Sequence, residues 1–329
     1  MLRRALGSLG KATFEPTSLP RDAVTAIAIA PPVIAGLVLF RLPALAMLGV
    51  AVAVGAICQL VAWRAHVGGV GVPAVSAVIA VALLGPGSPL PWVAAAALIG
   101  AALNVILRRL APGARLEPGL IGAAAVLLAS SGRAASYFQP GSRLYGLEPI
   151  RLWEQYFIQF GQSPVDAIRL YVGNIPGPVF ATSLLAVAVG AAWYWYARRL
   201  SLLVVATFVL GALLPISLFN WPVRYQLDSG PLWFVGALIL ADRRNLPASK
   251  AGRPLLGFAA GLLAVVPRSR GYAIEATIAE VAGLQVLLAL IEGGGWMAAN
   301  RARVWNQIRG AKAQPVARRQ KRGYRPSSS

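Results

Sequence analysis

Long runs of apolar residues, separated by short polar stretches, dominate the chain between residues 22 and 292. A helix needs about 20 mainly apolar residues to cross the hydrocarbon core of a bilayer. The pattern therefore predicts an all-α, polytopic membrane protein. We place about ten transmembrane segments, near 23–40, 42–63, 71–85, 91–110, 117–131, 178–197, 201–219, 230–241, 255–267 and 272–291.

Several of these segments are shorter than a full span, including the one that ends at Gly85-Pro86-Gly87 and the one that ends at Ala241-Asp242. Short, glycine- or proline-interrupted segments indicate broken or re-entrant helices, which a membrane tolerates only where protein or a cavity surrounds them. The longest polar stretch divides the segments into five and five. An odd number in each half means that two related halves would be inverted in the membrane.

The same pattern divides the chain into five parts. These are a cytoplasmic N-terminal arm (1–21), a first membrane half (22–131), an outer loop (132–177), a second membrane half (178–292) and a basic cytoplasmic tail (293–329). In the outer loop, apolar residues recur at helical spacing: Leu152, Trp153, Tyr156, Phe157 and Phe160. This helix either lies in the membrane interface or packs on the outer face of the protein itself, and the pattern leaves both readings open.

Composition and charge agree with a membrane location. The chain is 57% hydrophobic and only 13% charged, whereas a soluble domain carries roughly 25% charged residues. Most of the 31 lysines and arginines fall in segments that are inside if the N-terminus is inside. The positive-inside rule thus predicts both termini on the cytoplasmic side of a bacterial-type inner membrane. We expect the basic tail to contact anionic lipid rather than nucleic acid.

The scarcity of cysteine and histidine excludes several kinds of chemistry. Cys58 and His66 are the only residues of their types, so one chain cannot form a disulfide, a thiolate-ligated cluster, a zinc site or a bis-histidine haem site. No Walker motif and no promising Ser-His-Asp arrangement is present. The sequence therefore predicts no metal site and no catalytic residues, and any redox cofactor must be organic or belong to a partner.

Two carboxylates lie within the last apolar segment, where they are costly and usually functional. Glu275 and Glu280 are five residues apart, so their side chains leave a helix about 140° apart and do not form one paired site. Each could belong to an ion path. The alternative is pairing with arginine, and Arg268 and Arg270 are close in sequence.

Two strings stand out for their glycines and polar residues. The first is Gly173-Asn174-Ile175-Pro176-Gly177, followed by Ala181-Thr182-Ser183. Thr182 or Ser183 can cap the next helix, whose N-terminus attracts anions. The second begins at Ser229-Gly230 and continues through Gly236-Ala237, Ala241-Asp242 and Pro247 to Gly252. Glycine at such spacing permits close approach of helices.

These strings resemble the RnfD/NqrB family, the membrane subunits of Rnf-type and sodium-pumping NADH:quinone electron-transport complexes. The family pattern "GN-P-G…ETS" is similar to 173–183, and "SGG…GAFFMATDP…SP…G" is similar to 229–252. The resemblance spans about residues 22–292 and implies an electron-transfer subunit that works with other membrane and peripheral subunits, carries flavin and couples electron flow to ion movement. The cofactor-binding residues that it implies are Gly173, Asn174, Pro176, Gly177, Thr182, Ser183, Ser229, Gly230 and Asp242; Glu275 and Glu280 are the candidates for an ion path.

The chain departs from the family where relatives join FMN to a threonine of a Ser/Thr-Gly-Ala-Thr motif. The nearest string, Ser131-Gly132-Arg133-Ala134, lacks the acceptor hydroxyl at its fourth place. We therefore expect no covalent FMN. We expect instead a flavin that is bound non-covalently, either FMN or riboflavin. The family element "GQN-FNPA" is also reduced, to Gly113-Ala114-Arg115-Leu116-Glu117-Pro118-Gly119.

Two other functions stay open at this point. The five-plus-five pattern with broken segments is also typical of inverted-repeat transporters and channels, although this is an argument from fold alone. The lost flavin acceptor is compatible with a non-catalytic membrane scaffold for a redox or biosynthetic partner. In the preferred reading the chain is at most one subunit of an oxidoreductase complex.

Overall fold

The computed structural model describes residues 19–66, 71–111, 113–142, 144–156, 164–270 and 274–292. Most of the N-terminal arm, the basic tail, and Phe157 and Phe160 of the predicted outer helix lie outside these ranges. Within them the chain is helical and forms no strand, only isolated bridges such as the one between Leu200 and Asp242. The all-α prediction is confirmed.

Among the described residues, four helices are long and apolar enough to cross a membrane: α2 (Arg21–Phe40), α3 (Leu42–Arg64), α5 (Leu90–Leu110) and the helix Ile274–Glu292. Four shorter apolar helices accompany them: α4 (Pro73–Ala82), α6 (Pro118–Ala129), α9 (Leu184–Tyr196) and α10 (Leu202–Leu218). The count of ten spans is not confirmed. The predicted segment 230–241 is helical only over residues 232–240, where Phe234–Leu240 form a π-helix, η3. The segment 255–267 corresponds to α12 (Gly252–Val265).

The remaining elements are short and lie between these helices. They are η2 (Arg133–Ala135), α7 (Pro149–Tyr156), α8 (Ala167–Val172), α11 (Val223–Asp228), η4 (Arg243–Asn245) and η5 (Val266–Arg270). On α7, Trp153 is buried against Leu170, Ile175 and Tyr225. This face of the outer helix therefore packs on the protein itself.

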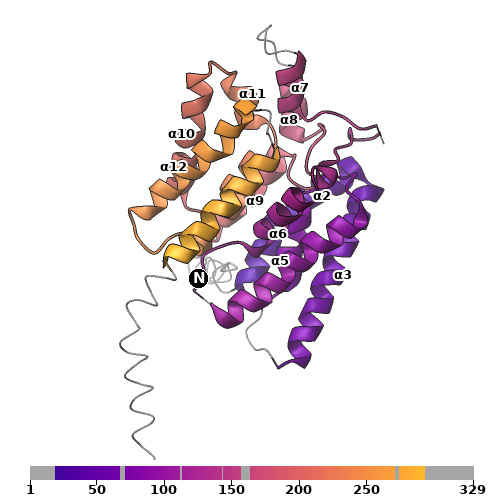
Figure 1. Ribbon diagram of the computed structural model, residues 1–329, viewed down its shortest axis with the longest axis vertical. Coiled ribbons are helices and arrows are strands. Elements are labelled where there is room, and N and C mark those ends of the chain that lie inside the picture. The colour runs from indigo at the N-terminus through magenta and orange to yellow at the C-terminus, as the bar shows by residue number, and fades with distance from the viewer. Residues whose placement is uncertain are drawn as a thin grey trace, which may run out of the picture. The chain divides into compact units, whose positions relative to one another are not determined.

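Small residues determine how the helices pack in the compact unit that ends at Val286. α3, α4, α5 and α6 form one group, and α10 and α12 form another (Figure 1). At Gly122 of α6, an added Cβ would lie 2.6 Å from the carbonyl oxygen of Ala96 on α5. α9 packs on α2, where the Trp193 indole donates to the carbonyl of Val24 at 3.1 Å.

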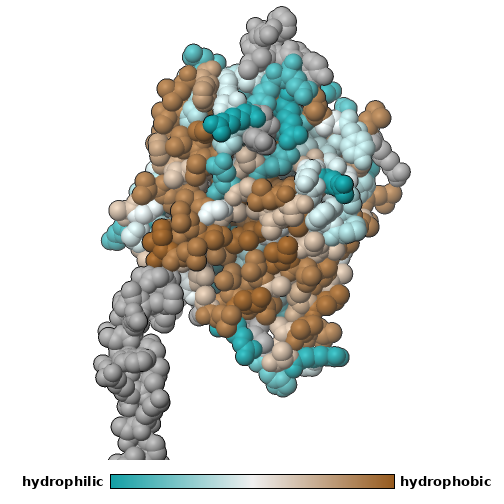
Figure 2. Space-filling model, in the orientation of Figure 1, coloured by the Kyte–Doolittle hydropathy of each residue, from teal (hydrophilic) through white to brown (hydrophobic). Residues whose placement is uncertain are grey.

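Apolar side chains cover much of the helix surface. Figure 2 shows a brown apolar band across the middle of one face, with hydrophilic residues toward both ends. Many large apolar residues are exposed on the long helices, for example Val38, Val61 and Leu98. In water such a continuous surface would be unfavourable, whereas against hydrocarbon it is the surface that a spanning helix requires.

The two short segments predicted near 71–85 and 230–241 run in opposite directions. The first begins at Val72, whose N–H donates to Asp22, and its last residues meet the backbone of Val179 and Phe180. The second starts beyond Ser229 and ends at Asp242, on the side where the first one begins. The inverted relation of the two halves stays a prediction, but this arrangement places the ends of several segments around one cavity.

Candidate functional site

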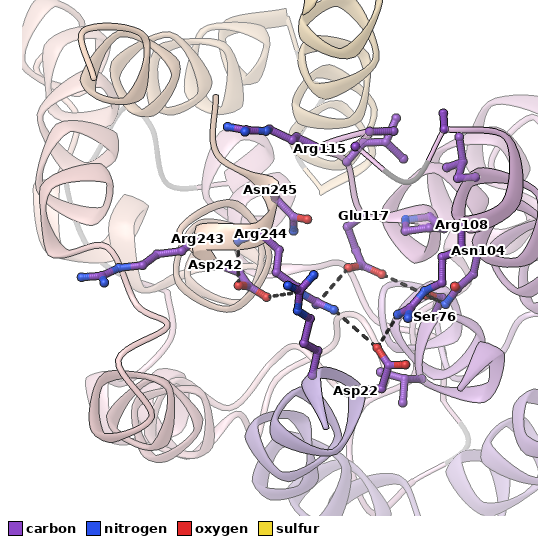
Figure 3. A pocket seen from close by; sticks show the side chains of 18 of the residues that line it. Asp22, Ser76, Asn104, Arg108, Arg115, Glu117, Asp242, Arg243, Arg244 and Asn245 are labelled. Atoms are coloured by element: carbon purple, nitrogen blue, oxygen red, sulfur yellow. Dashed lines mark hydrogen bonds and ion pairs between the residues drawn. The ribbon is translucent and has the colours of Figure 1, made fainter. Parts of the chain in front are cut away.

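A cavity of about 720 Å³ lies where α2, α4, α5, η4 and the start of α12 meet. Its volume is within the usual range of small-molecule sites, roughly 300–1,000 Å³. Figure 3 shows its side chains converging from both halves of the chain. The residues that line it are Arg21, Asp22, Val75, Ser76, Asn104, Leu107, Arg108, Ala111, Gly113, Ala114, Arg115, Leu116, Glu117, Pro118, Arg199, Asp242, Arg243, Arg244, Asn245 and Arg253.

Arg244 occupies the centre of the cavity and faces three carboxylates (Figure 3). Its Nε lies 2.9 Å from Asp242 Oδ2, its Nη1 3.5 Å from Asp22 Oδ1 and its Nη2 3.6 Å from Glu117 Oε2. Burial alone would lower the pKa of the Arg244 guanidinium, but Asp242 and Glu117 raise it well above its ordinary value. Arg244 is therefore a permanent cation that joins three separate segments.

Asp242 is fully buried and is held from two sides. Besides Arg244, it accepts from Arg199, whose Nε lies 3.3 Å from Asp242 Oδ1. It also caps η4, because Oδ1 accepts the backbone N–H of Arg244 at 3.1 Å. Arg199 itself donates to the carbonyl of Arg21 at 2.6 Å and lies over the Tyr194 ring, 5.2 Å from its centroid.

The first half of the chain supplies most of the other hydrogen-bonded and ion-paired residues that line the cavity. Asp22 on α2 pairs with Arg108 at the end of α5. On α4 and α5, a hydrogen-bond chain runs from Asn104 Nδ2 to Ser76 Oγ (2.9 Å) and from Ser76 Oγ to Glu117 Oε1 (3.1 Å). The backbone N–H of Glu117 donates to Gln285 Oε1 at 3.1 Å. These polar lining residues thus form a connected network rather than a set of isolated charges.

The structure divides the cofactor residues that the sequence suggested. Gly173, Gly177, Thr182 and Ser183 gather at the beginning of α9, while Asp242 lies beyond its other end, at the cavity. Thirteen helical residues separate the two places, a distance of about 20 Å at 1.5 Å per residue. The predicted set therefore does not form one site.

Close packing accounts for the glycines of the first string. Gly173 has φ +86°, and an added Cβ would lie 2.6 Å from the backbone nitrogen of Ser183. At Gly177 it would lie 2.7 Å from Thr182 Cγ2. Ser183 caps α9, since its Oγ accepts the N–H of Ala186 at 3.3 Å. These contacts give the first string a structural role, which is to pack the backbone of 173–177 against the start of α9.

The other members of the set are also placed away from Asp242. Asn174 is exposed, and Pro176 fits against Gly146, where a Cβ would lie 2.8 Å from Pro176 Cγ. Ser229 is buried and donates to the carbonyl of Tyr225 at 2.6 Å. Gly230 follows it with φ +73°, at the start of the segment that ends at Asp242.

The outer carboxylates form a second polar cluster. Glu275 pairs with Arg151 of α7 at 2.8 Å, so its arginine partner is not the neighbouring Arg268 or Arg270 that the sequence suggested. Arg268 is directed to Gln226 instead, donating to its backbone and side-chain oxygens at 2.7 and 3.0 Å. Glu275 pairs with a residue distant in sequence because the outer loop brings α7 over the start of the last helix. An ion-path role for Glu275 and for the partly buried Glu280 stays a prediction.

Glu148 is the most deeply buried acid of this cluster, with its side chain 1% exposed. Burial raises the pKa of the Glu148 carboxyl to about 8, and repulsion by Glu275 adds to the effect. Arg151, whose Nε lies 3.5 Å away, opposes the rise without cancelling it. Glu148 therefore holds a proton at neutral pH.

The position that would have to hold FMN covalently does not fit the group. Ala134 stands in the fourth place of the relevant string and is fully buried. Its carbonyl accepts from Gly85 N–H at 3.0 Å and from Ser88 Oγ at 2.6 Å. An alanine side chain has no oxygen with which to form a phosphoester. The arginine-rich cavity, in contrast, has the volume and the mixed polar and apolar walls of a non-covalent site.

Sequence reasoning missed most of this cavity, although two signals pointed to it. The reduced family element 113–119 supplies a continuous part of its wall, and the second string contributes Asp242. Nothing in either string shows that the two meet. Asp22, Arg108 and Arg199 come from elsewhere, and in the sequence they are indistinguishable from ordinary charges at helix ends.

Comparisons with known proteins give one family. The model of the family described as NQR2, RnfD, RnfE matches residues 21–292, most of the chain. Among curated proteins, none matches the chain. The matched range contains both the cavity and the outer cluster.

Proposed function

The chain belongs to the NQR2, RnfD, RnfE family, and we propose on this basis that it holds a non-covalent flavin and passes electrons across or along the membrane. The family makes it a membrane subunit of a multi-subunit Rnf/Nqr-type complex. The match over residues 21–292 is the observation that carries the proposal. A catalytic role for this chain alone is not part of it.

The arginine-rich cavity is our candidate for the flavin site. Its volume suits a ligand of this size, and Val75, Leu107 and Leu116 give it apolar wall. Asn104 is 4% exposed and its Oδ1 has no hydrogen-bond partner, so it can accept from a ring N–H or a hydroxyl. A bound flavin supplies one- and two-electron transfer. The fixed arginines of the cavity would stabilise a ligand whose negative charge increases on reduction.

We place this cavity at the cytoplasmic face of an inner membrane. Arg108, Arg115, Arg199 and Arg244 all line it, and all follow segments that the positive-inside rule directs to the cytoplasm. The same orientation places α7 and Glu275 on the outer side. The basic tail would then meet the anionic lipid of the inner leaflet.

Purification from native membranes tests the proposal. A tagged chain, extracted in a mild detergent, should co-purify with further redox subunits and should bring flavin with it. Recovery of the chain alone and without flavin would overturn the electron-transfer role.

Two further outcomes would favour the alternative functions. Flux through proteoliposomes containing only this chain would favour a transporter. Recovery of a partner that keeps full activity with Asp242→Asn would favour a scaffold.

A further inference from the structure

One side of the helix Ile274–Glu292 is buried in the protein. The residues of that side recur at helical spacing: Ile274, Thr277, Ile278, Val281, Ala282 and Gln285. Thr277 Oγ1 donates to the carbonyl of Ala264 on α12 at 2.9 Å, and this contact fixes how the helix is rotated. Gln285, about two turns further on, accepts from the backbone N–H of Glu117. The opposite side is therefore the one that the described part of the chain leaves uncovered.

The uncovered face of this helix presents Ala276, Glu280 and Gly283. Ala276 and Glu280 are half-buried, and Gly283 is exposed. Their spacing of four and three residues places them one above another on the helix. An added Cβ at Gly283 would meet no atom within 4 Å, whereas one at Gly261 of α12 would collide with α10. Packing within this chain therefore gives no reason for a glycine at 283, where it costs helix stability.

Glu280 is the charged member of the uncovered face. It is the seventh residue of this 19-residue helix, so it lies about 9 Å from the helix start, within a hydrocarbon core about 30 Å thick. No charged side chain of the described residues acts on Glu280, and none pairs with it. Carboxylates at membrane depth are costly, and almost all of them face protein and have a partner. Glu280 therefore needs a partner from outside the described chain.

We infer that the uncovered face docks a transmembrane helix of a different subunit of the complex, and that this helix presents a lysine or arginine to Glu280. The small side chains of Ala276 and Gly283 let two helix backbones approach closely. The ion pair then removes the cost of an unpaired carboxylate in the membrane. The inference goes beyond the proposed function: it rests on membership of a multi-subunit complex and not on the flavin.

Charge complementarity favours a different subunit over a second copy of this chain. In the apolar helices that the structure describes, arginine occurs only near the ends, as do Arg21 of α2, Arg64 of α3 and Arg108 of α5. The helices α4, α6, α9 and α10 contain neither lysine nor arginine. A symmetric dimer through this face would place two Glu280 carboxylates together. The cation that pairs with Glu280 therefore belongs to another kind of chain.

A photoreactive amino acid at position 276 tests the partner directly. In the complex within native membranes, benzoylphenylalanine in place of Ala276 should cross-link this chain to one other membrane subunit, which mass spectrometry identifies. The same probe combined with Glu280→Lys is the control and should lose the cross-link. Adducts with lipid alone, with a second copy of the chain or with the chain's own basic tail would overturn the inference.

Gly283→Leu tests the close approach of the partner helix. The larger side chain has space in the chain alone, so the Tm of the isolated chain should stay at the wild-type value. Recovery of the partner with the tagged chain should fall at least about tenfold, because the leucine overfills the contact. Gly49→Leu is the matched control, since it makes the same change at an exposed position of α3 with nothing within 4 Å. Unchanged recovery with Gly283→Leu, or an equal loss with Gly49→Leu, would contradict the docking face.

A charge exchange tests the ion pair. Glu280→Lys should abolish recovery of the partner, and glutamate in place of the partner's membrane lysine or arginine should restore it. If Glu280→Leu leaves recovery unchanged but stops ion transport, Glu280 belongs to an ion path and the inference is overturned. A cross-linked partner in a complex without extractable flavin would keep this inference and overturn the proposed flavin. A flavin-loaded complex whose assembly ignores changes at Glu280 and Gly283 would do the reverse.

Discussion

At the scale of single residues, burial makes the ion network around Arg244 sensitive to the loss of any one member. Asp242 is fully buried and shared by Arg199 and Arg244. The sequence pointed to Asp242 as important, and Arg244 is only two residues along the chain, but its other partner, Arg199, is 43 residues away. The contact with Arg199 depends on the packed structure, and no local spacing predicts it.

Asp242→Asn should destabilise the chain markedly. The change leaves two arginines without their shared carboxylate, and breaking a buried ion pair from one side costs about 3–5 kcal/mol. Thermal unfolding in detergent should show the loss as a lower Tm. Asp166→Asn is the control, because Asp166 is exposed. Equal Tm values for the two variants would contradict the network described above.

Glu148 gives stability a pH dependence of known sign. Its pKa of about 8 lies above the ordinary 4.5, so between these values the folded state holds a proton that the unfolded state has released. Stability therefore falls as pH rises from 5 to 8, by at most about 1.4 kcal/mol per pH unit. Glu148→Gln should reduce this fall and raise the Tm at pH 8. A wild-type Tm that rises over this range, or an unchanged slope in the variant, would argue against a buried neutral Glu148.

At the scale of elements, glycine spacing was the more reliable guide. On α12, an added Cβ at Gly257 would collide with Thr207 of α10, and one at Gly261 would collide with the carbonyl oxygen of Phe208. Gly211 on α10 is in the reciprocal position against Phe258. The segment 230–241 was harder to predict. In the structure, Gly236 of this segment lies against the Phe208 ring of α10, and Asn245 Nδ2 donates to the Ile239 carbonyl.

Gly261→Ala should separate α10 from α12. The added methyl group has no space, so we expect a destabilisation of about 1–3 kcal/mol, measured as a lower midpoint of thermal unfolding. Gly49→Ala is the matched change on α3, where nothing lies within 4 Å of the added Cβ. It should be neutral or slightly stabilising, because alanine favours helix. A Gly261→Ala protein as stable as wild type would refute the close crossing.

At the scale of the whole molecule, apolar runs were sufficient to predict a helical membrane protein, and the family match agrees. They could not predict how functional residues are distributed between the two ends of the helices. The Gly173 string and Asp242 both carry the family resemblance, yet α9 separates them. Only the chain path shows that 113–119 and Asp242 share a cavity.

The proposed orientation predicts a labelling pattern. In a Cys58→Ser background, Ser249→Cys should react with a membrane-impermeant maleimide only after the cytoplasmic side is opened. Ser142→Cys should react in intact cells, because the proposed orientation directs the outer loop outward. Both serines are exposed, so access to the reagent depends on the side of the membrane. The opposite pattern would invert the topology and place the cavity outside.

The central claim, that this chain carries a non-covalent flavin in an electron-transport complex, is tested most directly by acid extraction of the complex purified from native membranes. We predict a flavin absorbance spectrum that a partner's substrate bleaches, and full release of the flavin into the acid-soluble fraction. On a denaturing gel, the band of this chain should show no flavin fluorescence, because Ala134 offers no acceptor hydroxyl. A complex without extractable flavin, or a fluorescent band for this chain, would contradict the account.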